Sequence, residues 1–500
     1  MTEQYKIFET ELTGTDKGNP YAEVWLKADF INDSELISVN GFYCGNGHYK
    51  IRFMPTKPGT WTGVTHSNDS QLNNIALTCE CAPAEKGNHG RVLPMSDVLP
   101  QDVSQDTSLE ESKFHFAYED GTRFQPFGTT CYAWIHQPTE IQEQTLETLQ
   151  KSPFNKVRMC IFPKFYTYNT TNPQYYAFAG SEEEGFDFTR FNPLFWDNLE
   201  NRIRQLDALG IEADIILLHP YDRWGFSKMN RDTDVFYLKY AVDRLCHFKN
   251  IWWSLANEYD LLPWKSVEDW ELYARVILRR DSYGHLRSIH NCMKLYDHSS
   301  PWITHASIQR VDVYKTAENV GEWRQLYQKP VVVDECSYEG NINFGWGNIT
   351  GEELTRRFWE GCIRGGYLTH GEVYVQYDQI WWSHGGTLHG TCPERIAFLK
   401  KIMADTPPGA APLKLTPENH MTNWDVPCLC KEDDHSYYLY YFGFSKPAFR
   451  TYELTEGCCY EIELIDTWDM TINKLPGVYS GSIKIDMPEK QYMAIRITKR

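Results

Sequence analysis

A long hydrophobic run is the first feature that this chain lacks. None of its segments approaches the roughly 18 consecutive apolar residues that a membrane-spanning helix needs, although 42% of the 500 residues are hydrophobic. The amino terminus, Met1 to Lys6, has neither the basic start nor the apolar segment of a secretory signal. We therefore expect a soluble, cytoplasmic protein without a membrane partner, unless a leader has been removed.

Positive charge is scarce relative to negative charge. The chain has 49 Lys and Arg against 67 Asp and Glu, which gives a net charge of -18 at pH 7. A protein of this sign repels phosphate backbones and anionic lipid surfaces. Nucleic acid is therefore not expected as the main partner, and a neutral or cationic ligand fits better.

Paired cysteine motifs are also missing. The 14 cysteines include no C-x-x-C pair, and Cys79 and Cys81 would share one face of a strand rather than bridge each other. His384 and His389 have no helical register with a carboxylate between them, and no H-x-H motif begins the first barrel strand. We expect free thiols, no metal site and no cofactor.

Aromatic residues, in contrast, are abundant. They make up 15% of the chain and include 17 Trp and 31 Tyr. Flat rings with polar edges suit the apolar faces and hydroxyl groups of sugars. A large aromatic core explains the same composition, so composition alone leaves both interpretations open.

The length indicates more than one domain, because single cores stop growing at about 250 to 300 residues. Residues 1–90 and 407–500 alternate apolar and polar residues in short runs, which predicts a small β-sandwich at each end. Residues 91–112 are polar and irregular and are expected to be a linker. Residues 113–406 remain for a central domain.

The central domain shows the rhythm of parallel β/α units, in which an apolar strand is followed by an amphipathic helix. Asn192-Pro193 and Gly210 mark the start and end of one helix, and Thr350 and Gly365 mark those of another. Eight strands make a closed (β/α)8 TIM barrel, so the predicted fold is an α/β barrel between two β-sandwiches. The strands are expected to begin near Phe124, Asn155, Ile211, Ile251, Leu286, Trp302, Pro330 and Gly366.

Two of these strands end in a glutamate. The apolar run from Ile251 leads to Asn257-Glu258 at strand four, and the run from Pro330 leads to Glu335 at strand seven. Catalytic groups of such barrels sit at the carboxyl ends of the strands. Two carboxylates at one cavity suggest glycoside hydrolysis, whereas a solvated strand-end acid is the alternative for each residue taken singly.

The Asn257-Glu258 pair conflicts with regular strand geometry. Strict alternation places Ser254 and Glu258 on one face of the strand and Asn257 on the other. Both side chains reach the mouth of the barrel only if the backbone is irregular, and β-bulges are common beside active sites. We therefore predict a bulge near the tip of this strand.

The two glutamates with Asn257 give the sequence a family resemblance. Asn257-Glu258 at strand four with Glu335 at strand seven resembles clan A of the glycoside hydrolases, which are retaining (β/α)8 enzymes. The segments 127–134 and 218–222 are similar to the apiosidase-like members, which also carry an amino-terminal sandwich. The resemblance implies that Glu258 is the general acid and base, Glu335 the nucleophile, and Asn257 a partner for the sugar hydroxyl next to the anomeric carbon.

Further side chains of the central domain are candidates for sugar binding. Arg158 is a charge inside the apolar second strand, where it needs a partner such as the nucleophile or a sugar. His219 at the tip of strand three and His305 at the tip of strand six occupy sugar-binding positions of the resembled family. A snorkelling edge position is the alternative for Arg158, and a satisfied core histidine is the alternative for each His.

Aromatic residues follow the first and last strands of the predicted barrel. Trp134 and Trp382 could form walls of the site, and core packing is the alternative. The long insert 166–187 contains several Tyr residues and could close one end of the groove. A closed end would make the enzyme exo-acting.

These observations lead to one hypothesis and one rival. The hypothesis is a retaining glycosidase that acts on neutral oligosaccharides, with Glu335 ionised and Glu258 protonated, so that their environments must separate the two pKa values. The rival is a catalytically inactive carbohydrate-binding or scaffold protein on a glycosidase-like barrel. The sequence leaves the sugar, the linkage and the oligomeric state open.

Overall fold

A computed structural model describes residues 1–33, 35–98, 109–312, 315–375, 380–432 and 434–500. The middle of the predicted linker, residues 99–108, lies outside the described residues. No helix in the described part is long and apolar enough to cross a membrane. Each of the 14 cysteines has a free thiol.

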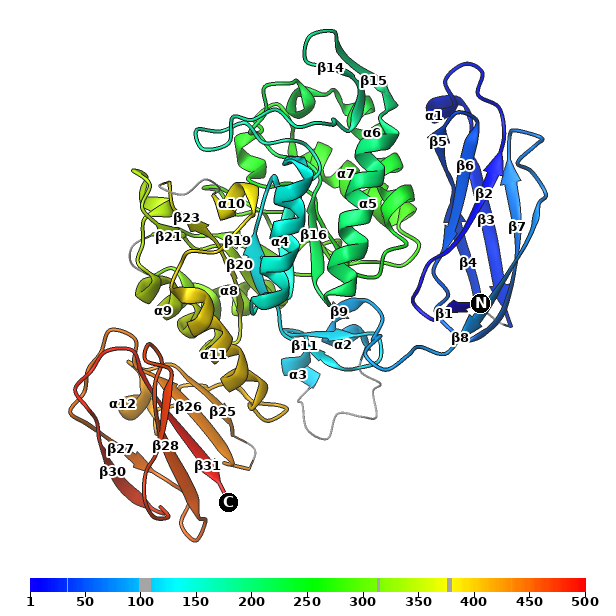
Figure 1. The fold of residues 1–500 in the computed structure, drawn as a ribbon. Coiled ribbons are helices and arrows are strands. Elements are labelled where there is room, and N and C mark those ends of the chain that lie inside the picture. Colours follow the sequence, from blue (N-terminus) through cyan, green and yellow to red (C-terminus); the bar gives the residue numbers. More distant parts are fainter. Residues whose placement is uncertain (34, 99–108, 313–314, 376–379, 433) are drawn as a thin grey trace.

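The centre of the molecule is a parallel sheet of eight strands that curls into a nearly closed barrel (Figure 1). An isolated parallel bridge between His290 and Ser307 lies where the first and last strands of the sheet approach each other. The eight predicted parallel strands are therefore confirmed. In sheet order they are β18 (Arg287–Ser288), β17 (Ile251–Ser254), β16 (Glu212–Ile216), β13 (Lys156–Cys160), β12 (Phe127–Thr130), β22 (Tyr367–His370), β20 (Val331–Glu335) and β19 (Ala306–Gln309).

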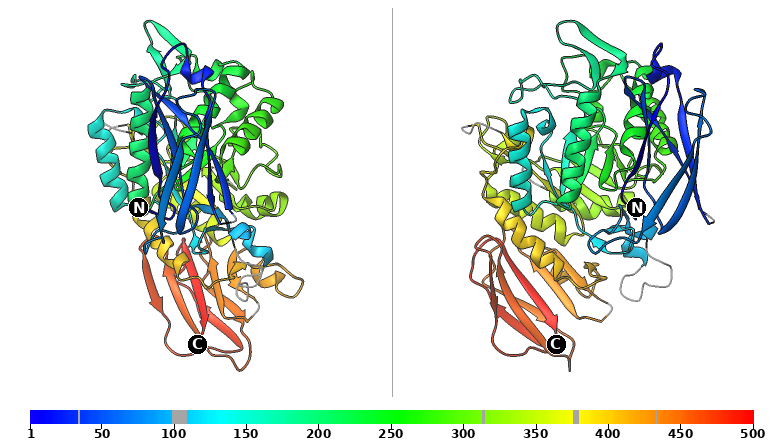
Figure 2. Two further views of the ribbon diagram at one scale, coloured as in Figure 1. Left: turned by 90° about the vertical axis from the view of Figure 1, so that its right-hand side faces the viewer. Right: turned by 45° about the vertical axis from the view of Figure 1, so that its right-hand side comes forward.

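Helices surround this sheet on its outer side (Figures 1 and 2). Asn192 begins α5 by accepting a hydrogen bond from the Leu194 N–H, with Pro193 in the first turn, and Thr350 accepts from the Glu353 N–H at the start of α9. Both predicted helices are thus confirmed with their caps. The long helices are α4 (Thr139–Lys151), α5 (Pro193–Ala208), α6 (Arg231–Leu245), α7 (Val267–Arg280), α8 (Val320–Tyr327), α9 (Gly351–Ile363) and α11 (Cys392–Ala404).

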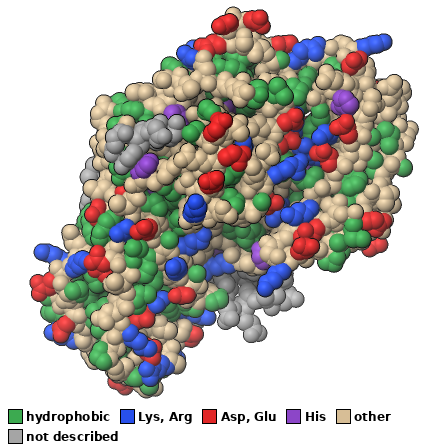
Figure 3. Space-filling view, in the orientation of Figure 1, with side chains coloured by type: hydrophobic (Ala, Val, Ile, Leu, Met, Phe, Trp, Pro, Cys, Tyr) green, Lys and Arg blue, Asp and Glu red, His purple; other side chains and the backbone are tan. Residues whose placement is uncertain are grey.

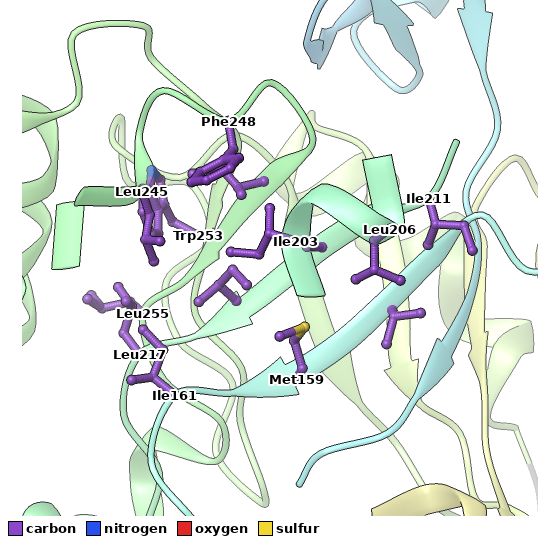
Figure 4. Packing of buried hydrophobic residues seen from close by; sticks show 14 of the residues in the cluster. Met159, Ile161, Ile203, Leu206, Ile211, Leu217, Leu245, Phe248, Trp253 and Leu255 are labelled. Carbon is purple, nitrogen blue, oxygen red and sulfur yellow. The ribbon is translucent and has the colours of Figure 1, made fainter. Parts of the chain in front are cut away.

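The outer faces of the strands bury their apolar side chains against these helices. Met159 of β13 and Trp253 of β17 lie close to Ile203 and Leu206 of α5 in one packed cluster (Figure 4). All four side chains are fully buried. Apolar burial of this kind, worth about 1.5 to 3 kcal/mol for each large side chain, holds the strand ends in fixed positions.

A short antiparallel sheet covers the amino-terminal end of the barrel. It consists of β9 (Val92–Pro94), β10 (Phe116–Tyr118) and β11 (Arg123–Phe124). Phe116 and Phe124 pack against Trp252 and against Tyr367, which is the first residue of its strand. This end of the barrel is apolar and closed, which leaves the carboxyl end for a site.

Separate β-sheets flank the barrel at the two ends of the chain (Figures 1 and 2). The amino-terminal sheets have the orders β1-β8-β7-β3-β4 and β2-β6-β5, and the carboxyl-terminal sheets have the orders β24-β25-β26-β31-β28-β29 and β27-β30. The domain boundaries at residues 90, 112 and 406 stay predictions. The amino-terminal strands are β1 (Thr2–Glu3), β2 (Phe8–Thr13), β3 (Leu26–Asn32), β4 (Glu35–Asn40), β5 (Phe42–Gly45), β6 (His48–Phe53), β7 (Gly59–Ser67) and β8 (Ala76–Ala82). The carboxyl-terminal strands are β24 (Ala411–Pro412), β25 (Cys428–Lys431), β26 (Tyr437–Tyr441), β27 (Phe449–Glu453), β28 (Tyr460–Asp466), β29 (Thr471–Lys474), β30 (Ser482–Asp486) and β31 (Met493–Lys499).

A buried ion-pair cluster joins the amino-terminal sheets to the barrel. Arg52 of β6 reaches Glu200 of α5, with Nη2 2.6 Å from Oε2, and donates to the main-chain oxygen of Arg244 in α6. On the surface, acidic and basic side chains are interspersed over the face drawn in Figure 3. The Arg52–Glu200 contact between these two parts, in contrast, is buried.

Candidate active site

The two predicted glutamates lie at the carboxyl ends of their strands. Glu335 is the last residue of β20, and Glu258 follows β17 by four residues. Their exposed fractions are 8% and 4%. The charge of Glu258 raises the pKa of Glu335, so the two carboxyl groups interact within one site.

A register shift in β20 turns Glu335 into the barrel. Ile308 pairs with Val333 and Gln309 pairs with Glu335, so Asp334 is the extra residue of a bulge. Val331 and Val333 face the outer core, and strict alternation would send Glu335 the same way. Instead Asp334 and Glu335 both reach the interior, where Asp334 accepts from Lys156, Ser307 and Thr369.

The backbone at Glu258 is irregular in another way than predicted. The strand β17 ends at Ser254, and Glu258 has left-handed dihedrals, with φ 51° and ψ 55°. The irregularity is thus a left-handed residue beyond the strand, and the predicted bulge occurs on β20 instead. It brings the Asn257 amide next to the acid, with Nδ2 donating to Glu258 Oε2 over 3.2 Å. Such backbone strain clusters at functional sites.

Each glutamate has its own phenol. Tyr132 follows β12. Its hydroxyl donates to Glu335 Oε1 and accepts from Arg158 Nη1 over 3.2 Å. Burial and the charge of Glu258 raise the pKa of Tyr221, in the loop after β16, and that of Cys292, in the loop after β18. Three loops therefore surround the two acids.

Arg158 lies in the interior, as predicted, and is fully buried. Its Nη1 is 3.9 Å from Glu335 Oε1, and its Nε is 3.4 Å from Asp214 Oδ2. Arg158 therefore reaches Glu335 through an ion pair and through the Tyr132 hydroxyl, while Asp214 and Asp334 share its charge. The snorkelling alternative is excluded by this burial.

The pKa of Glu335 differs from the expectation for an ionised nucleophile. Burial and the nearby charge of Glu258 raise it to about 7, although Arg158, Lys164 and the Tyr132 hydrogen bond act in the opposite direction. Arg158 has the largest of these lowering effects, and its charge is shared with Asp214 and Asp334.

The two predicted histidines do not contact the site as expected. His219 lies beyond the end of β16 but is 3% exposed, with Nε2 near the Phe162 oxygen and Nδ1 accepting from the Tyr221 N–H. It is a satisfied core histidine that holds the loop of Tyr221. The placement of His305 was wrong: it precedes β19 and packs on Phe116 at the closed end of the barrel.

The two predicted tryptophans have different surroundings. Trp134 is fully buried in the main core cluster, so the expectation that it forms a wall of the site was wrong. Trp382, 4% exposed, packs edge-on against Tyr132 and lies 5.1 Å from the ring of Trp346. Tyr166, the first residue of the long insert, adds its ring to the same cluster. Trp382 therefore belongs to an aromatic group at the mouth.

Sequence reasoning missed several residues of the site, namely Tyr132, Lys164, Tyr221, Cys292 and Tyr338. Tyr132 and Tyr221 lie within the two segments that carry the family resemblance. Lys164 is a cation between Phe162 and Phe165 shortly after strand two, which is an unusual pattern that could have been noticed. Cys292 gives no signal in the sequence.

Buried polar atoms without a hydrogen-bond partner in the described part of the protein lie at this end of the barrel. Among the described residues they include Arg158 Nε and Nη2, Asn257 Oδ1, both ring nitrogens of His290 and the Tyr338 hydroxyl. Buried groups of this kind are normally satisfied by water or a ligand. These atoms are therefore left for water or a bound polar ligand. No group of three or more potential metal ligands occurs in the described ranges.

Comparisons with known proteins agree with this geometry. The model of a family described as "Apiosidase-like, catalytic domain" matches residues 110–405. Two domains of unknown function match residues 1–68 and 424–498. None of the curated proteins that were compared matches the chain.

Solved structures give the same picture for the whole chain. A provisionally assigned glycoside hydrolase from Bacteroides vulgatus is 34% identical, with a TM-score of 0.90, and the match covers 100% of this chain and 99% of that one. A family 5 glycoside hydrolase from the same organism is 16% identical, with a TM-score of 0.61, and the match covers 81% and 94%. The second likeness concerns the fold alone.

Proposed function

The chain belongs to the family of apiosidase-like catalytic domains, and from this premise we propose that it hydrolyses glycosidic bonds of neutral oligosaccharides by a retaining double displacement. The observation that carries the proposal is the pair Glu258 and Glu335, each held by its own phenol at the open end of the barrel. We further propose that the barrel is of the TIM type and that the enzyme is related to clan A. Exo action is also a proposal.

The chemistry proceeds in two steps in this proposal. A Glu335 oxygen attacks the anomeric carbon while the bond to the leaving oxygen breaks, and that oxygen takes a proton from Glu258. Water then attacks the glycosyl-enzyme ester, Glu258 accepts the proton of that water, and Glu335 leaves as a carboxylate. Asn257, held against Glu258, has a free Oδ1 to accept from a sugar hydroxyl.

Before the reaction starts, the Glu258–Glu335 pair must carry one proton in total. Burial and Glu258 raise the pKa of Glu335 to about 7, so attack by Glu335 at neutral pH needs the proton to reside on Glu258. A neutral sugar adds no charge that would disturb this balance. The inactive-barrel rival is disfavoured, because a scaffold does not require two buried acids that each lie beside a separate phenol.

The experiment is a panel of aryl glycosides with NMR detection of the first anomer released. Wild type is expected to cleave at least one glycoside with retention, and Glu335→Gln is expected to lose this turnover. Glu212→Gln is the matched control, because Glu212 is a buried barrel glutamate at the closed end, hydrogen bonded to Trp252. Inverted product or unchanged turnover in Glu335→Gln would refute the nucleophile. Lack of turnover on every glycoside would favour the binding protein.

The exo proposal has its own test. The insert 166–187 lies beside the mouth, where Tyr166 contacts both Tyr221 and Trp382. An enzyme with one closed end releases a single sugar from the start of hydrolysis of a longer oligosaccharide. A mixture of internal fragments at early times would contradict exo action.

A further inference from the structure

Lys164 lies within the candidate site, and the chemistry above assigns it no role. Its side chain is 4% exposed. Nζ is 4.2 Å from the ring centroid of Tyr132, 4.3 Å from that of Tyr221 and 4.4 Å from that of Trp382. An ammonium over the faces of three rings is attracted to each of them. The side chain is therefore held in place by a three-ring cage.

Two walls of this cage are the phenols that hold the two acids. Tyr132 donates to Glu335, and the charge of Glu258 acts on the Tyr221 hydroxyl. The main chain reinforces the arrangement, because the Phe165 N–H donates to the Tyr221 oxygen over 2.8 Å. Lys164 thus lies between Tyr132 and Tyr221, and its charge interacts with both Glu258 and Glu335.

The Lys164 ammonium group has N–H donors that make no hydrogen bond to the residues that the structure describes. Within the described part of the chain, Nζ has its three ring contacts but neither an ion pair nor a hydrogen bond to the protein. The Lys164 main-chain oxygen, in contrast, is engaged by Asn169 Nδ2 over 2.7 Å. A buried cation with unused donors beside two acids acts through its charge and through a bound polar ligand.

The balance of buried charges differs between the interior of the barrel and its mouth, where Lys164 lies. Deeper in the barrel, the cations Lys156 and Arg158 balance the carboxylates of Asp214 and Asp334. At the mouth, Lys164 is the remaining cation among the described residues beside Glu258 and Glu335, since Arg158, 3.9 Å from Glu335 Oε1, is shared with Asp214 and Asp334. This outer group of three is neutral only when one of the two carboxyl groups carries a proton. One acid and one carboxylate are what a double displacement requires.

We propose that Lys164 is the residue that fixes the proton count of the Glu258–Glu335 pair at one, and that its free N–H groups bind a hydroxyl of the sugar. This inference rests on the proposed glycosidase function and adds a positioning and substrate-binding residue to it. It also favours a neutral sugar, because an acidic sugar would leave one negative charge unbalanced at the mouth.

Other titratable groups around Glu335 stay neutral over the relevant pH range. Burial raises the pKa of the surrounding phenols above the ordinary value for tyrosine, and it raises the pKa of each of the surrounding thiols to about 12. Burial lowers the pKa of His219, near Lys164, to about 4. These neutral groups are Tyr132, Tyr221, Tyr338, Cys160, Cys292 and Cys336.

The test is the pH profile of kcat/KM in Lys164→Met. Loss of the cation makes both carboxyl groups hold protons more tightly, so both limbs of the bell are expected to move up by about one pH unit. KM is expected to rise as well, because a donor to the sugar is lost. Lys164→Arg keeps the charge and is expected to keep the wild-type limbs. A bell that stays in place in Lys164→Met, whatever the loss of rate, would overturn the proposal.

Lys228→Met is the matched control. Lys228 is an exposed lysine whose Nζ is 5.8 Å from the ring centroid of Trp264, and it is not among the charges that act most on Glu335. Its removal is expected to leave both limbs unchanged, which separates a local effect from a general loss of positive charge. A shift of equal size in Lys228→Met would count against a specific role for Lys164.

A second measurement reads the ionisation without turnover. The δ-carbon of Glu335, labelled with 13C and assigned by its loss in Glu335→Gln, is followed by NMR as a function of pH. Its midpoint is expected to rise in Lys164→Met and to stay near the wild-type value in Lys164→Arg. An unchanged midpoint would refute the electrostatic role even if the wild type cleaves glycosides. A raised midpoint in a protein that cleaves none would separate this inference from a failed function.

Discussion

Tyr132 and Tyr221 determine how the two acids differ at the level of single residues. Tyr132 hydrogen bonds Glu335 and also contacts Arg158, whereas Tyr221 is linked to Glu258, which has the Asn257 amide as a second partner. Hydrogen bonds to a carboxylate favour the charged form. The phenol of Tyr132 therefore supports the ionised state of Glu335 directly.

Tyr132→Phe removes this donor with little change of shape. A hydrogen bond to a charged group is worth about 1.5 to 3 kcal/mol, so kcat/KM is expected to fall roughly 10- to 100-fold, and the acid limb of its pH profile is expected to move up. Tyr367→Phe is the control, because the Tyr367 hydroxyl contacts His115 at the closed end. Equal losses in both variants would mean that Tyr132 acts only through packing.

Glu258→Gln separates the acid from the nucleophile. General acid catalysis contributes about 100- to 10,000-fold, and the loss is expected to be largest for glycosides whose leaving groups need a proton. Aryl glycosides with strongly acidic phenols are expected to retain a fast first step, and added azide is expected to restore turnover. A rate loss independent of the leaving group would assign Glu258 another role.

The residues predicted from the sequence are those whose position follows from a strand end. Glu258 and Glu335 each follow a clear apolar run, so the barrel rule was enough to bring them together. His305 was misplaced because the apolar run from Trp302 predicted a strand that in fact begins at Ala306. Lys164 was missed because its cage is built from three loops that are distant in the sequence.

The bulge in β20 is the element that makes the site possible. It lets Asp334 anchor the interior cations while its neighbour Glu335 also faces inward. Nothing in the run Val331 to Glu335 distinguishes a bulged strand from a regular one, because the difference depends on the pairing with β19. The sequence therefore predicted a bulge after β17, where the irregularity is instead the left-handed backbone of Glu258, and it did not predict the bulge in β20.

Asp334→Asn tests this anchor. Lys156 and Arg158 hold the pKa of Asp334 well below its usual range, so the residue is charged and its neutralisation breaks a buried ion pair. A stability loss of roughly 3 to 5 kcal/mol is expected, measured as a lower midpoint of thermal unfolding. Glu212→Gln is the control, because burial raises the pKa of Glu212 to about 8 and the residue is uncharged at neutral pH. An unchanged midpoint in Asp334→Asn would contradict the anchor.

At the scale of the whole molecule, the amino-terminal sheets are held on the barrel by Arg52, Glu200 and Arg244. Arg52 and Arg244 lower the pKa of Glu200 from 4.5 to about 2, against the effect of burial. A depressed carboxyl pKa stabilises the fold above the unfolded-state pKa, and this stabilisation is lost as the pH falls through the folded-state pKa. The contact is therefore expected to weaken between about pH 4.5 and pH 2.

Glu200→Gln is expected to lower the free energy of unfolding by roughly 3 kcal/mol at pH 7, as measured by urea unfolding. The difference from wild type is expected to shrink as the pH falls from about 4.5 to about 2. Glu11→Gln, at an exposed pair with His48, is the control and is expected to change little. A difference that is constant down to pH 2 would contradict the assignment to Glu200.

The overall architecture was largely predictable, because strands of period two at both ends and β/α units in the middle leave a strong pattern in the sequence. The contacts between these parts were not predictable. Arg52 and Glu200 are 148 residues apart, and neither belongs to a motif. The domain boundaries stay predictions. The sequence left the sugar open, since the loops that form the mouth set the specificity.

In the proposed reaction Glu335 becomes covalently bonded to the sugar, and Glu258 donates and then accepts the proton. The most direct measurement is trapping with a 2-deoxy-2-fluoro glycosyl fluoride of the sugar that the aryl panel identifies, followed by mass spectrometry of the digested protein. One added glycosyl group is expected on the peptide that contains Glu335, and none is expected in Glu335→Gln. A protein that turns over the aryl glycoside with inversion, or that carries the label on another residue, would contradict the proposed reaction.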